Sequence, residues 1–385
     1  MSRPSRKRAG RSHQNRRRSR CTRQRRRRGR VTPPTPVAAP AALTAVAAPV
    51  EARLRSILES ERSRWVAVDS DLEAPLNVLT RFVVDGGKRL RPAFCHWAFV
   101  GAGGMADDPA IIDTGAAFEL LHAFALVHDD VMDGSSTRRG EPTIHSTFDA
   151  EHSSNQWNGE SRRFGEGVAI LVGDLAEVYA DRLMSNAPQT AFETWNELKI
   201  ELNIGQFLDV LGAARGEVDL TTARRIVRYK SGKYTIERPL HVGAALAGRL
   251  DELQTPLSRY GEPLGEAFQL RDDILGTFGD SARTGKPVGD DLREGKPTPM
   301  LAIALDRATN SQRDILSRVG SIDLAPDDIL AIQSVFTETG ALSEVEASIT
   351  QLTDQAISAL DDAAITSEAL VALRELAVYV GARDV

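Results

Sequence analysis

Apolar residues recur every three or four positions along most of this 385-residue chain, and this spacing constrains its fold more than any other feature. The pattern is clear at Leu54, Ile57 and Leu58, and it returns between Ile111 and Val127. Further segments with this spacing lie around 166–186, 197–213, 221–229, 239–250, 258–276, 299–306 and 328–380. Alternation with a period of two, which is typical of half-buried strands, is scarce. The sequence therefore predicts one all-α domain over residues 51–385.

Charge is divided unevenly between the first 30 residues and the rest of the chain. Residues 1–30 contain 15 of the 48 Lys and Arg residues and no acid, so the remainder carries 33 basic against 53 acidic residues. We expect residues 1–50 to form a disordered Arg-rich tail followed by a Pro/Ala linker, since so many like charges cannot pack. The tail has three open interpretations: a dispensable or misassigned extension, an arm that binds a polyanion, or a targeting peptide.

Other whole-chain features indicate the compartment and exclude some partners. The acidic body argues against nucleic-acid binding by the folded domain. Only two cysteines occur, Cys21 and Cys95, so a disulfide framework is not expected and a reducing compartment fits. No uninterrupted apolar stretch approaches the roughly 20 residues of a transmembrane segment, and no secretory apolar region follows the arginines. These features predict a cytoplasmic protein.

An acidic cluster ends one of the apolar helical segments. Asp129, Asp130 and Asp133 stand there, and His122 lies about two turns earlier on a similar face. Neighbouring carboxylates repel one another, and the helix dipole disfavours anions at a helix C-terminus. A positive partner is therefore required, and all-oxygen ligands suit Mg²⁺. The alternative is an exposed helix end with ordinary solvated acids.

A second acidic cluster and a set of cations make the metal interpretation stronger. Gln269, Asp272, Asp273 and Gly276 form one stripe at the end of another apolar helix. Two such clusters facing each other would form a multi-metal site for a polyanion. Guanidinium groups and lysines bind phosphates, and the candidates here lie beside acidic clusters or in polar loops. They are Lys88, Arg91, Arg138, Arg139, Lys230, Lys233, Lys286 and Lys296.

In this order, the motifs resemble those of the trans-type isoprenyl diphosphate synthases, or polyprenyl synthetases, over residues 51–385. The chain looks most like bacterial geranylgeranyl diphosphate synthases. The motifs are GGKRLRP at 86–92, ELLHAFALVHDDVMD at 119–133, RRGEPT at 138–143, GD at 173–174, GQFLD at 205–209, YKSGKYT at 229–235, FQLRDDILGTFGD at 268–280 and GKPVGDDLREGKPTP at 285–299.

This resemblance implies an isoprenoid-synthase fold, with helices around a central cavity, and a homodimer. It assigns the metal site, with about three Mg²⁺ ions, to Asp129, Asp130, Asp133, Asp272 and Asp273. Isopentenyl diphosphate would bind Lys88, Arg91, His122 and Arg139. The allylic diphosphate would bind Arg138, Lys230, Ser231, Gln269 and Lys286. Catalysis would rest on the five aspartates with Arg138 and Lys230.

The implied reaction is a condensation of isopentenyl diphosphate with an allylic diphosphate through an allylic cation. Phe124 and Ala125 precede the first acidic cluster, and a bulky ring at 124 would limit the product to geranylgeranyl diphosphate (C20). A farnesyl or longer polyprenyl diphosphate synthase stays an alternative, as does a class I terpene cyclase. A non-catalytic partner subunit is disfavoured, because such subunits lose their aspartates.

The chain departs from the family pattern at two places. Gly276 stands where the second motif usually has a third Asp, and Asp280 is a weak substitute. Ser231 follows Lys230 where the family usually has Thr, and alignment with Lys233 in place of Lys230 stays open.

Overall fold

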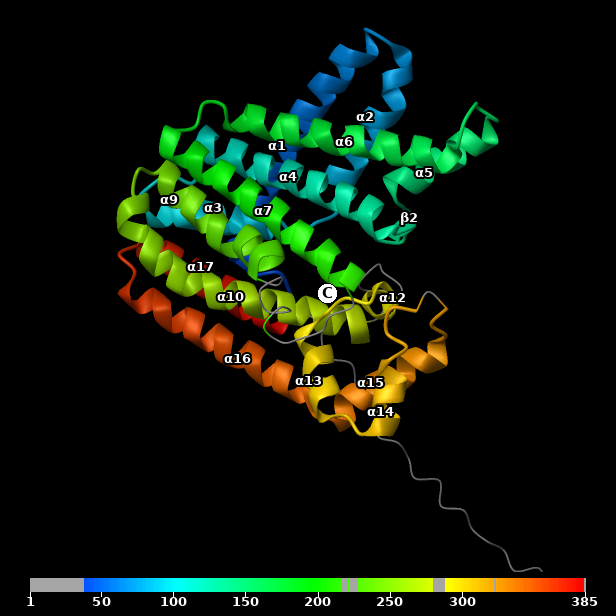
Figure 1. Cartoon of the computed structure of the whole chain (residues 1–385). Coiled ribbons are helices and arrows are strands. Elements are labelled where there is room, and N and C mark those ends of the chain that lie inside the picture. The colour runs from blue at the N-terminus through cyan, green and yellow to red at the C-terminus, as the bar shows by residue number, and fades with distance from the viewer. Residues whose placement is uncertain (1–37, 216–220, 222–227, 280–287, 322, 384–385) are drawn as a thin grey trace, which may run out of the picture. The chain divides into compact units, whose positions relative to one another are not determined.

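The computed structural model describes residues 38–215, 221, 228–279, 288–321 and 323–383. Almost all of this part of the chain is helical, which confirms the predicted all-α class (Figure 1). The helices are α1 (Ala41–Val66), α2 (Glu73–Val84), α3 (Leu90–Gly101), α4 (Pro109–Asp133), α5 (Ile144–Ser154), α6 (Ser161–Met184), α7 (Gln189–Arg215), α9 (Arg238–Leu246), α10 (Leu250–Phe278), α12 (Asp290–Glu294), α13 (Pro299–Arg307), α14 (Asn310–Leu316), α15 (Pro326–Glu338), α16 (Ala341–Ala359) and α17 (Ser367–Ala382).

Shorter elements join these helices. The segments η1 (Ser70–Leu72) and η3 (Leu360–Asp362) are single 3₁₀ turns, and η2 (Arg228–Glu237) is a π-helix. Two strands of two residues each, β1 (Thr137–Arg138) and β2 (Glu141–Pro142), form an antiparallel hairpin directly after α4. In the described residues this hairpin is the only sheet, and it positions Arg138 beside the end of α4.

The folded body begins about ten residues earlier than the predicted boundary at residue 50. Residues 36–385 form one compact unit, and α1 already starts at Ala41. Its first turns bury Leu43 and Val46, and Trp97 Nε1 donates a hydrogen bond of 2.7 Å to the Ala42 carbonyl. The expected linker is therefore helical in its second half, because its alanines favour a helix and its few apolar side chains find a core to cover. The Arg-rich residues 1–30 lie outside the described residues.

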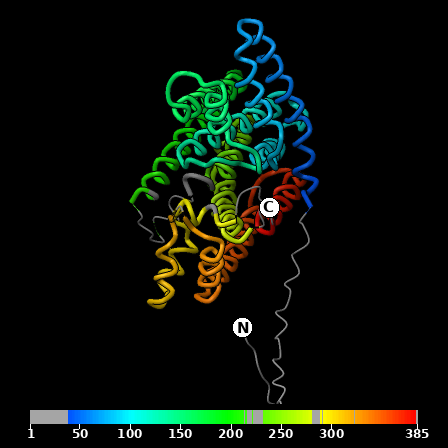
Figure 2. The backbone as a smooth tube through the Cα atoms, turned by 90° about the vertical axis from the view of Figure 1, so that its right-hand side faces the viewer, coloured from blue at the N-terminus to red at the C-terminus, as the bar shows by residue number. Residues whose placement is uncertain are grey.

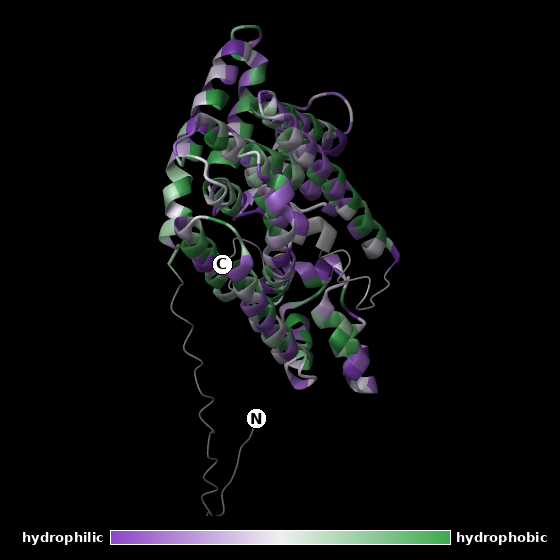
Figure 3. Ribbon diagram, turned by 90° about the vertical axis from the view of Figure 1, so that its left-hand side faces the viewer, coloured by the Kyte–Doolittle hydropathy of each residue, from purple (hydrophilic) through white to green (hydrophobic). Residues whose placement is uncertain are grey.

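Two hydrophobic clusters hold the described unit together. The larger cluster involves α1, α3, α4, α6 and α9, with α4 packed along α6 and α3 packed along α9. The smaller cluster joins the last turns of α10 to α12, α13, α15 and α16. Figure 2 shows the yellow and orange helices of this second cluster gathered at one end of the unit. Hydrophobic and hydrophilic residues share most helices, as the periodicity predicts (Figure 3).

Helix α4 is the most apolar of the long helices, and it carries the first acidic cluster. Within the described ranges it is the one helix long and apolar enough to cross a membrane, judged by length and composition alone. However, 67% of its apolar window is buried inside the protein, which is typical of a core helix. Asp108 caps its N-terminus by accepting a hydrogen bond from the Ala110 amide, and Gly134 ends it with a φ of +66°.

Candidate active site

The first acidic cluster is held by Arg138 from the hairpin after α4. Both carboxylate oxygens of Asp130 accept hydrogen bonds from Arg138, at 2.9 Å from Nε and 2.7 Å from Nη2. Burial opposes the charge on Arg138, but Asp130 outweighs it and raises the pKa of the guanidinium. Arg138 Nη2 also lies 3.9 Å from Asp129. The family resemblance assigns Arg138 to the allylic diphosphate, and in the structure its guanidinium neutralises the acidic helix end.

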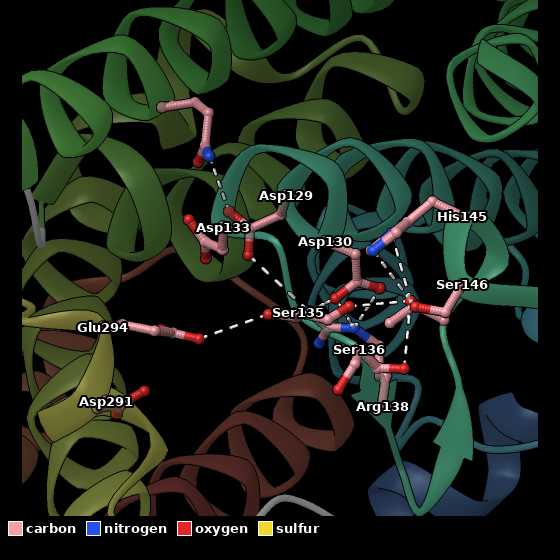
Figure 4. Close-up of polar contacts among 12 residues, drawn as sticks. Asp129, Asp130, Asp133, Ser135, Ser136, Arg138, His145, Ser146, Asp291 and Glu294 are labelled. Atoms are coloured by element: carbon pink, nitrogen blue, oxygen red, sulfur yellow. Dashed lines mark hydrogen bonds and ion pairs between the residues drawn. The ribbon is translucent and has the colours of Figure 1, made fainter. Parts of the chain in front are cut away.

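The other two aspartates of this cluster face different helices (Figure 4). Gln206 on α7 donates a hydrogen bond of 2.7 Å from Nε2 to Asp129. Asp133 lies 3.9 Å from the ammonium of Lys296, which follows α12. Ser135, just after α4, donates a bond of 3.5 Å to Glu294 on α12. The end of α4 and α12 therefore lie on two sides of one polar space.

Lys296 occupies the centre of this polar space. Its Nζ is 2.5 Å from Glu294 and 3.4 Å from Asp291, in addition to its contact with Asp133. Burial opposes its charge, but the surrounding carboxylates outweigh burial and raise the pKa of Lys296 well above its ordinary value. These carboxylates are Asp291, Glu294, Asp133 and Asp129. A fixed positive charge thus lies where several carboxylates converge.

The second acidic cluster stands at the C-terminal end of α10. Arg383 donates a hydrogen bond of 2.6 Å from Nη2 to Asp272, and its guanidinium lies 3.8 Å from the Phe268 ring centre. Gln269 donates a bond of 2.8 Å to Asp273 Oδ1, whereas the buried Oδ2 has no partner in the described part of the chain. Burial, helped by the charges of Asp291 and Asp272, raises the pKa of Asp273 to about 8.

A group of cations gathers beside the loop before α3. Arg91 donates a hydrogen bond of 2.9 Å to Thr235, and its guanidinium lies 4.3 Å from the Tyr234 ring centre. Arg139 donates a bond of 3.1 Å to the carbonyl of Asp85. The His122 ring lies 6.2 Å from that of Tyr234. Three of the four residues predicted to bind isopentenyl diphosphate therefore belong to one neighbourhood.

His122 is neutral in this neighbourhood. Burial lowers the pKa of its imidazole well below the ordinary value, and four surrounding arginines lower it further. These are Arg91, Arg139, Arg138 and Arg89. The buried Nδ1 has no hydrogen-bond partner among the described residues. An anionic ligand would complement the charges of Arg91 and Arg139 and would offer an acceptor to the imidazole.

The backbone of the Gly86–Gly87 loop is shaped by the buried Arg89. Gly87 has a φ of +98°, and a Cβ there would lie 2.9 Å from Arg89 Nη1. Arg89 pairs with the buried Glu119 on α4 and donates bonds of 3.1 and 3.2 Å to the carbonyls of Val83 and Val84. Glycine is required at 87, because a side chain would be strained and would press on this ion pair.

Lys88 lies at the opposite side of this loop, toward the C-terminal helix. Its Nζ is 6.0 Å from the Tyr379 ring centre. Burial and the charge of Arg383 lower its pKa to about 8, and Asp272 opposes this shift. Lys88 is therefore close enough to Asp272, in the second acidic cluster, to interact electrostatically with it.

The residues predicted to limit product length lie on the buried part of α4. Phe124 is buried, and its ring centre is 4.6 Å from that of His128. His128 in turn contacts the Ile170 carbonyl on α6 at 3.1 Å. Ala125 is half-buried beside Phe124. The Phe124 ring thus has a defined position between α4 and α6.

Some predicted residues cannot be compared with the structure. Lys286 and Asp280 lie outside the described residues, and for Lys230 and Ser231 only the backbone, in the π-helix η2, is described. Lys233, the alternative to Lys230, donates a hydrogen bond of 2.5 Å to Glu201 on α7.

The predicted magnesium cage is not assembled as a ready ligand set. Across the described ranges, no group of three or more His, Cys, Asp or Glu residues is arranged to hold a metal ion. Internal donors contact the aspartates in its place: Arg138, Gln206, Lys296, Arg383 and Gln269. The residues still fit Mg²⁺, because oxygen donors meet around the polar space and the buried Asp273 Oδ2 has no partner within the described part of the chain.

Several contacts in this space involve residues that the sequence analysis did not assign to the site. Gln206 and the α12 residues Asp291 and Glu294 belong to the motifs GQFLD and GKPVGDDLREGKPTP, to which no local pattern gives a role. In the sequence, Lys296 is one of several loop cations. Arg383 stands 111 positions from Asp272, and no local pattern in the sequence connects them.

An all-α fold with two aspartate-rich helix ends and a nearby arginine cluster fits an enzyme that acts on diphosphates. Residues 73–334 match the family model for polyprenyl synthetase. The geranylfarnesyl diphosphate synthase of Aeropyrum pernix is 33% identical over 68% of this chain and 79% of that protein. The geranylgeranyl diphosphate synthase of Mycobacterium tuberculosis is 33% identical over 75% of this chain and 79% of its own length.

A solved structure of a related enzyme supports the same family assignment. The geranylgeranyl pyrophosphate synthase of Corynebacterium glutamicum, solved with isoprenyl diphosphate and magnesium, superposes with a TM-score of 0.84 at 37% identity. The match covers 89% of this chain and 99% of that one. The chain therefore belongs to the polyprenyl synthetase family, and it is a trans-prenyltransferase.

Proposed function

We propose that this enzyme condenses isopentenyl diphosphate with allylic diphosphates and releases geranylgeranyl diphosphate as its main product. The observation that carries the proposal is the shared polar space in which Asp133 and Asp291 both contact the half-buried Lys296. The end of α4 and the helix α12 thereby direct carboxylates at one region, and α12 packs against α10, which carries the second acidic cluster. A site for a metal–diphosphate complex requires such convergence. The relatives named above support the chemistry, although they carry different product names.

The metal part of the proposal assigns Mg²⁺ to five aspartates at the ends of α4 and α10. The five are Asp129, Asp130, Asp133, Asp272 and Asp273. Magnesium bound there would neutralise the departing diphosphate, so that the allylic carbon–oxygen bond breaks more easily. Lys230 and Lys286, with Ser231 and Gln269, remain proposed contacts of the allylic diphosphate. The number of ions, about three, is part of the same proposal.

Isopentenyl diphosphate would bind in the cation group of Lys88, Arg91, His122 and Arg139. Arginines offer paired donors to phosphate oxygens, and the neutral His122 offers one hydrogen bond without an added charge. The double bond would then attack the allylic cation, and a proton would leave the condensed product. The apolar side of α4 would exclude water from the cation.

Product length is proposed to depend on Phe124. The rise of 1.5 Å per residue puts position 124 about 7.5 Å along the helix axis before Asp129. The buried Phe124 ring would stop the growing chain there, whereas Ala125 leaves room. Phe124→Ala should shift products beyond C20, and Phe336→Ala, in the other hydrophobic cluster, should leave the product length unchanged.

The direct test is an incubation of the purified protein with Mg²⁺, isopentenyl diphosphate and one allylic diphosphate of C5, C10 or C15, followed by mass spectrometry. We expect C20 to dominate and excess EDTA to stop turnover. Asp129→Ala and Asp272→Ala should each abolish turnover, while Asp251→Asn at the far end of α10 should not. Undiminished elongation in EDTA would contradict the metal assignment.

A homodimer is also proposed, through an exposed apolar stripe on α6 and α7. Leu171 is 68% exposed and Phe207 is 65% exposed, and other large apolar side chains extend the stripe. These are Ile170, Val178, Ile200, Ile204 and Val210. Such a stripe would be costly in water and is typical of an interface. Ile204→Glu should give monomers in light scattering, whereas Leu330→Glu, at an exposed position of α15, should not.

We also propose a cytoplasmic location for the enzyme, which the free thiol of Cys95 supports.

A further inference from the structure

The second acidic cluster has no side chain of its own at the position where its stripe would continue. Gly276 stands one turn after Asp272 and Asp273 on the same helix, α10. A Cβ added at Gly276 would lie 2.6 Å from Cγ of Asp291 and closer still to its Oδ2. The carboxylate of Asp291 thus occupies the volume that a side chain at 276 would fill.

Asp291 is held in this place by its own short helix. It belongs to α12, which packs against α10 and is bounded by Gly289 and Gly295. The Lys296 amide donates a bond of 3.2 Å to the Asp291 carbonyl, and the Lys296 ammonium lies 3.4 Å from its carboxylate. Asp291 therefore lies between the second acidic cluster and the ammonium that also contacts Asp133.

An unsatisfied atom beside Asp291 points to a missing ligand. Only 6% of the Asp273 surface is exposed, and its Oδ2 has no hydrogen-bond partner in the described residues. The charges of Asp291 and Asp272 both act on Asp273, which shows that the three carboxyl groups are neighbours. A buried acceptor without a donor costs free energy, and a cation shared with Asp291 would remove that cost.

We propose that Asp291 supplies the third carboxylate of the second acidic cluster, in place of the side chain that Gly276 lacks. The cluster is then split between two elements, with two carboxylates on α10 and one on α12. Asp280, the substitute considered from the sequence, is not needed in this arrangement. In the absence of a divalent ion, Lys296 neutralises Asp291, and cation binding would release Lys296 toward the diphosphate. This inference rests on the metal site proposed above.

The test measures Mn²⁺ binding to the full-length protein in the presence of inorganic pyrophosphate, by the electron paramagnetic resonance signal of free Mn²⁺. The variants are Asp291→Asn, the double variant Gly276→Asp/Asp291→Ala, in which Ala empties the volume that the Asp291 carboxylate fills, and Asp251→Asn as a matched control. We expect Asp291→Asn to weaken Mn²⁺ binding about tenfold or more. The double variant should recover most of this loss, since it returns a carboxylate to the same volume from the other helix.

The double variant separates metal binding from a purely structural role. It leaves Lys296 without the Asp291 carboxylate, so a structural role for the Asp291–Lys296 pair predicts no recovery. Thermal unfolding in EDTA shows whether each variant is folded. If Asp291→Asn binds Mn²⁺ as tightly as the wild type, Asp291 is not a ligand and this inference fails alone. If the wild type itself binds no Mn²⁺, the proposed metal site fails as well.

Discussion

Replacing Asp273 by Asn should stabilise the metal-free enzyme at neutral pH while it removes a carboxylate from the proposed cation site. The Asp273 carboxyl is buried, and its pKa is about 8 against an ordinary value of 3.8. Between these two values the unfolded chain gives up a proton that the folded protein keeps. The free energy of unfolding of the wild type therefore falls as the pH rises from about 4 to about 8. An Asn at 273 does not titrate, so the variant does not lose this stability.

The magnitude follows from the size of the window. Each pH unit inside it costs the wild type about 1.4 kcal/mol of unfolding free energy relative to the Asn variant. The stability difference between the two proteins should thus widen by about 3 kcal/mol between pH 5 and pH 7. Urea unfolding in EDTA at pH 5, 6 and 7 measures this difference, with Asp251→Asn as the control for removal of a carboxylate.

The reasoning would be refuted by a stability difference that stays constant over this pH range. A second measurement connects the same residue to function. Mg²⁺ with pyrophosphate should raise the unfolding temperature of the wild type and release a proton at pH 7, because the cation requires the ionised carboxylate. The Asp273→Asn variant should show neither effect, although it is the more stable protein without metal.

Three further predictions concern groups around the site. The KM for isopentenyl diphosphate should rise above pH 8, because the Lys88 ammonium, with a pKa of about 8, loses its charge there; Lys88→Arg should flatten this rise in steady-state kinetics. Glu119→Gln should lower the free energy of unfolding by about 3–5 kcal/mol, since it removes the buried carboxylate that pairs with the buried Arg89 and leaves only the more exposed Glu51, 3.4 Å away; a loss below 1 kcal/mol in urea titrations would argue against a buried ion pair. His241 is buried and its pKa is about 4, so the stability it contributes at neutral pH should be lost as pH falls from 6.5 toward 4; His241→Gln should show a shallower acid dependence in the same titrations.

The local features of the site were readable from the chain itself. Apolar spacing around Phe124 predicts a helix, and an acidic run after it predicts a helix end that needs positive partners. Arg138 follows within ten residues of Asp129, so a positive partner for the acidic helix end can be found from local sequence alone. The beginning of the folded body was missed by about ten residues, because the helix over residues 41–50 depends on a core that distant helices provide.

What the sequence determined alone is the helical class, the family resemblance and the residue types that can hold a diphosphate. Those follow from short-range patterns, since a helix repeats every 3.6 residues and motif spacing is local. Tertiary structure decided which charges meet. The contacts of Lys296 with Asp133, of Arg383 with Asp272 and of Asp291 with the space at Gly276 join elements that are separate along the chain. Such pairs depend on how helices pack, and packing depends on the fit of whole helix faces, which no local pattern encodes.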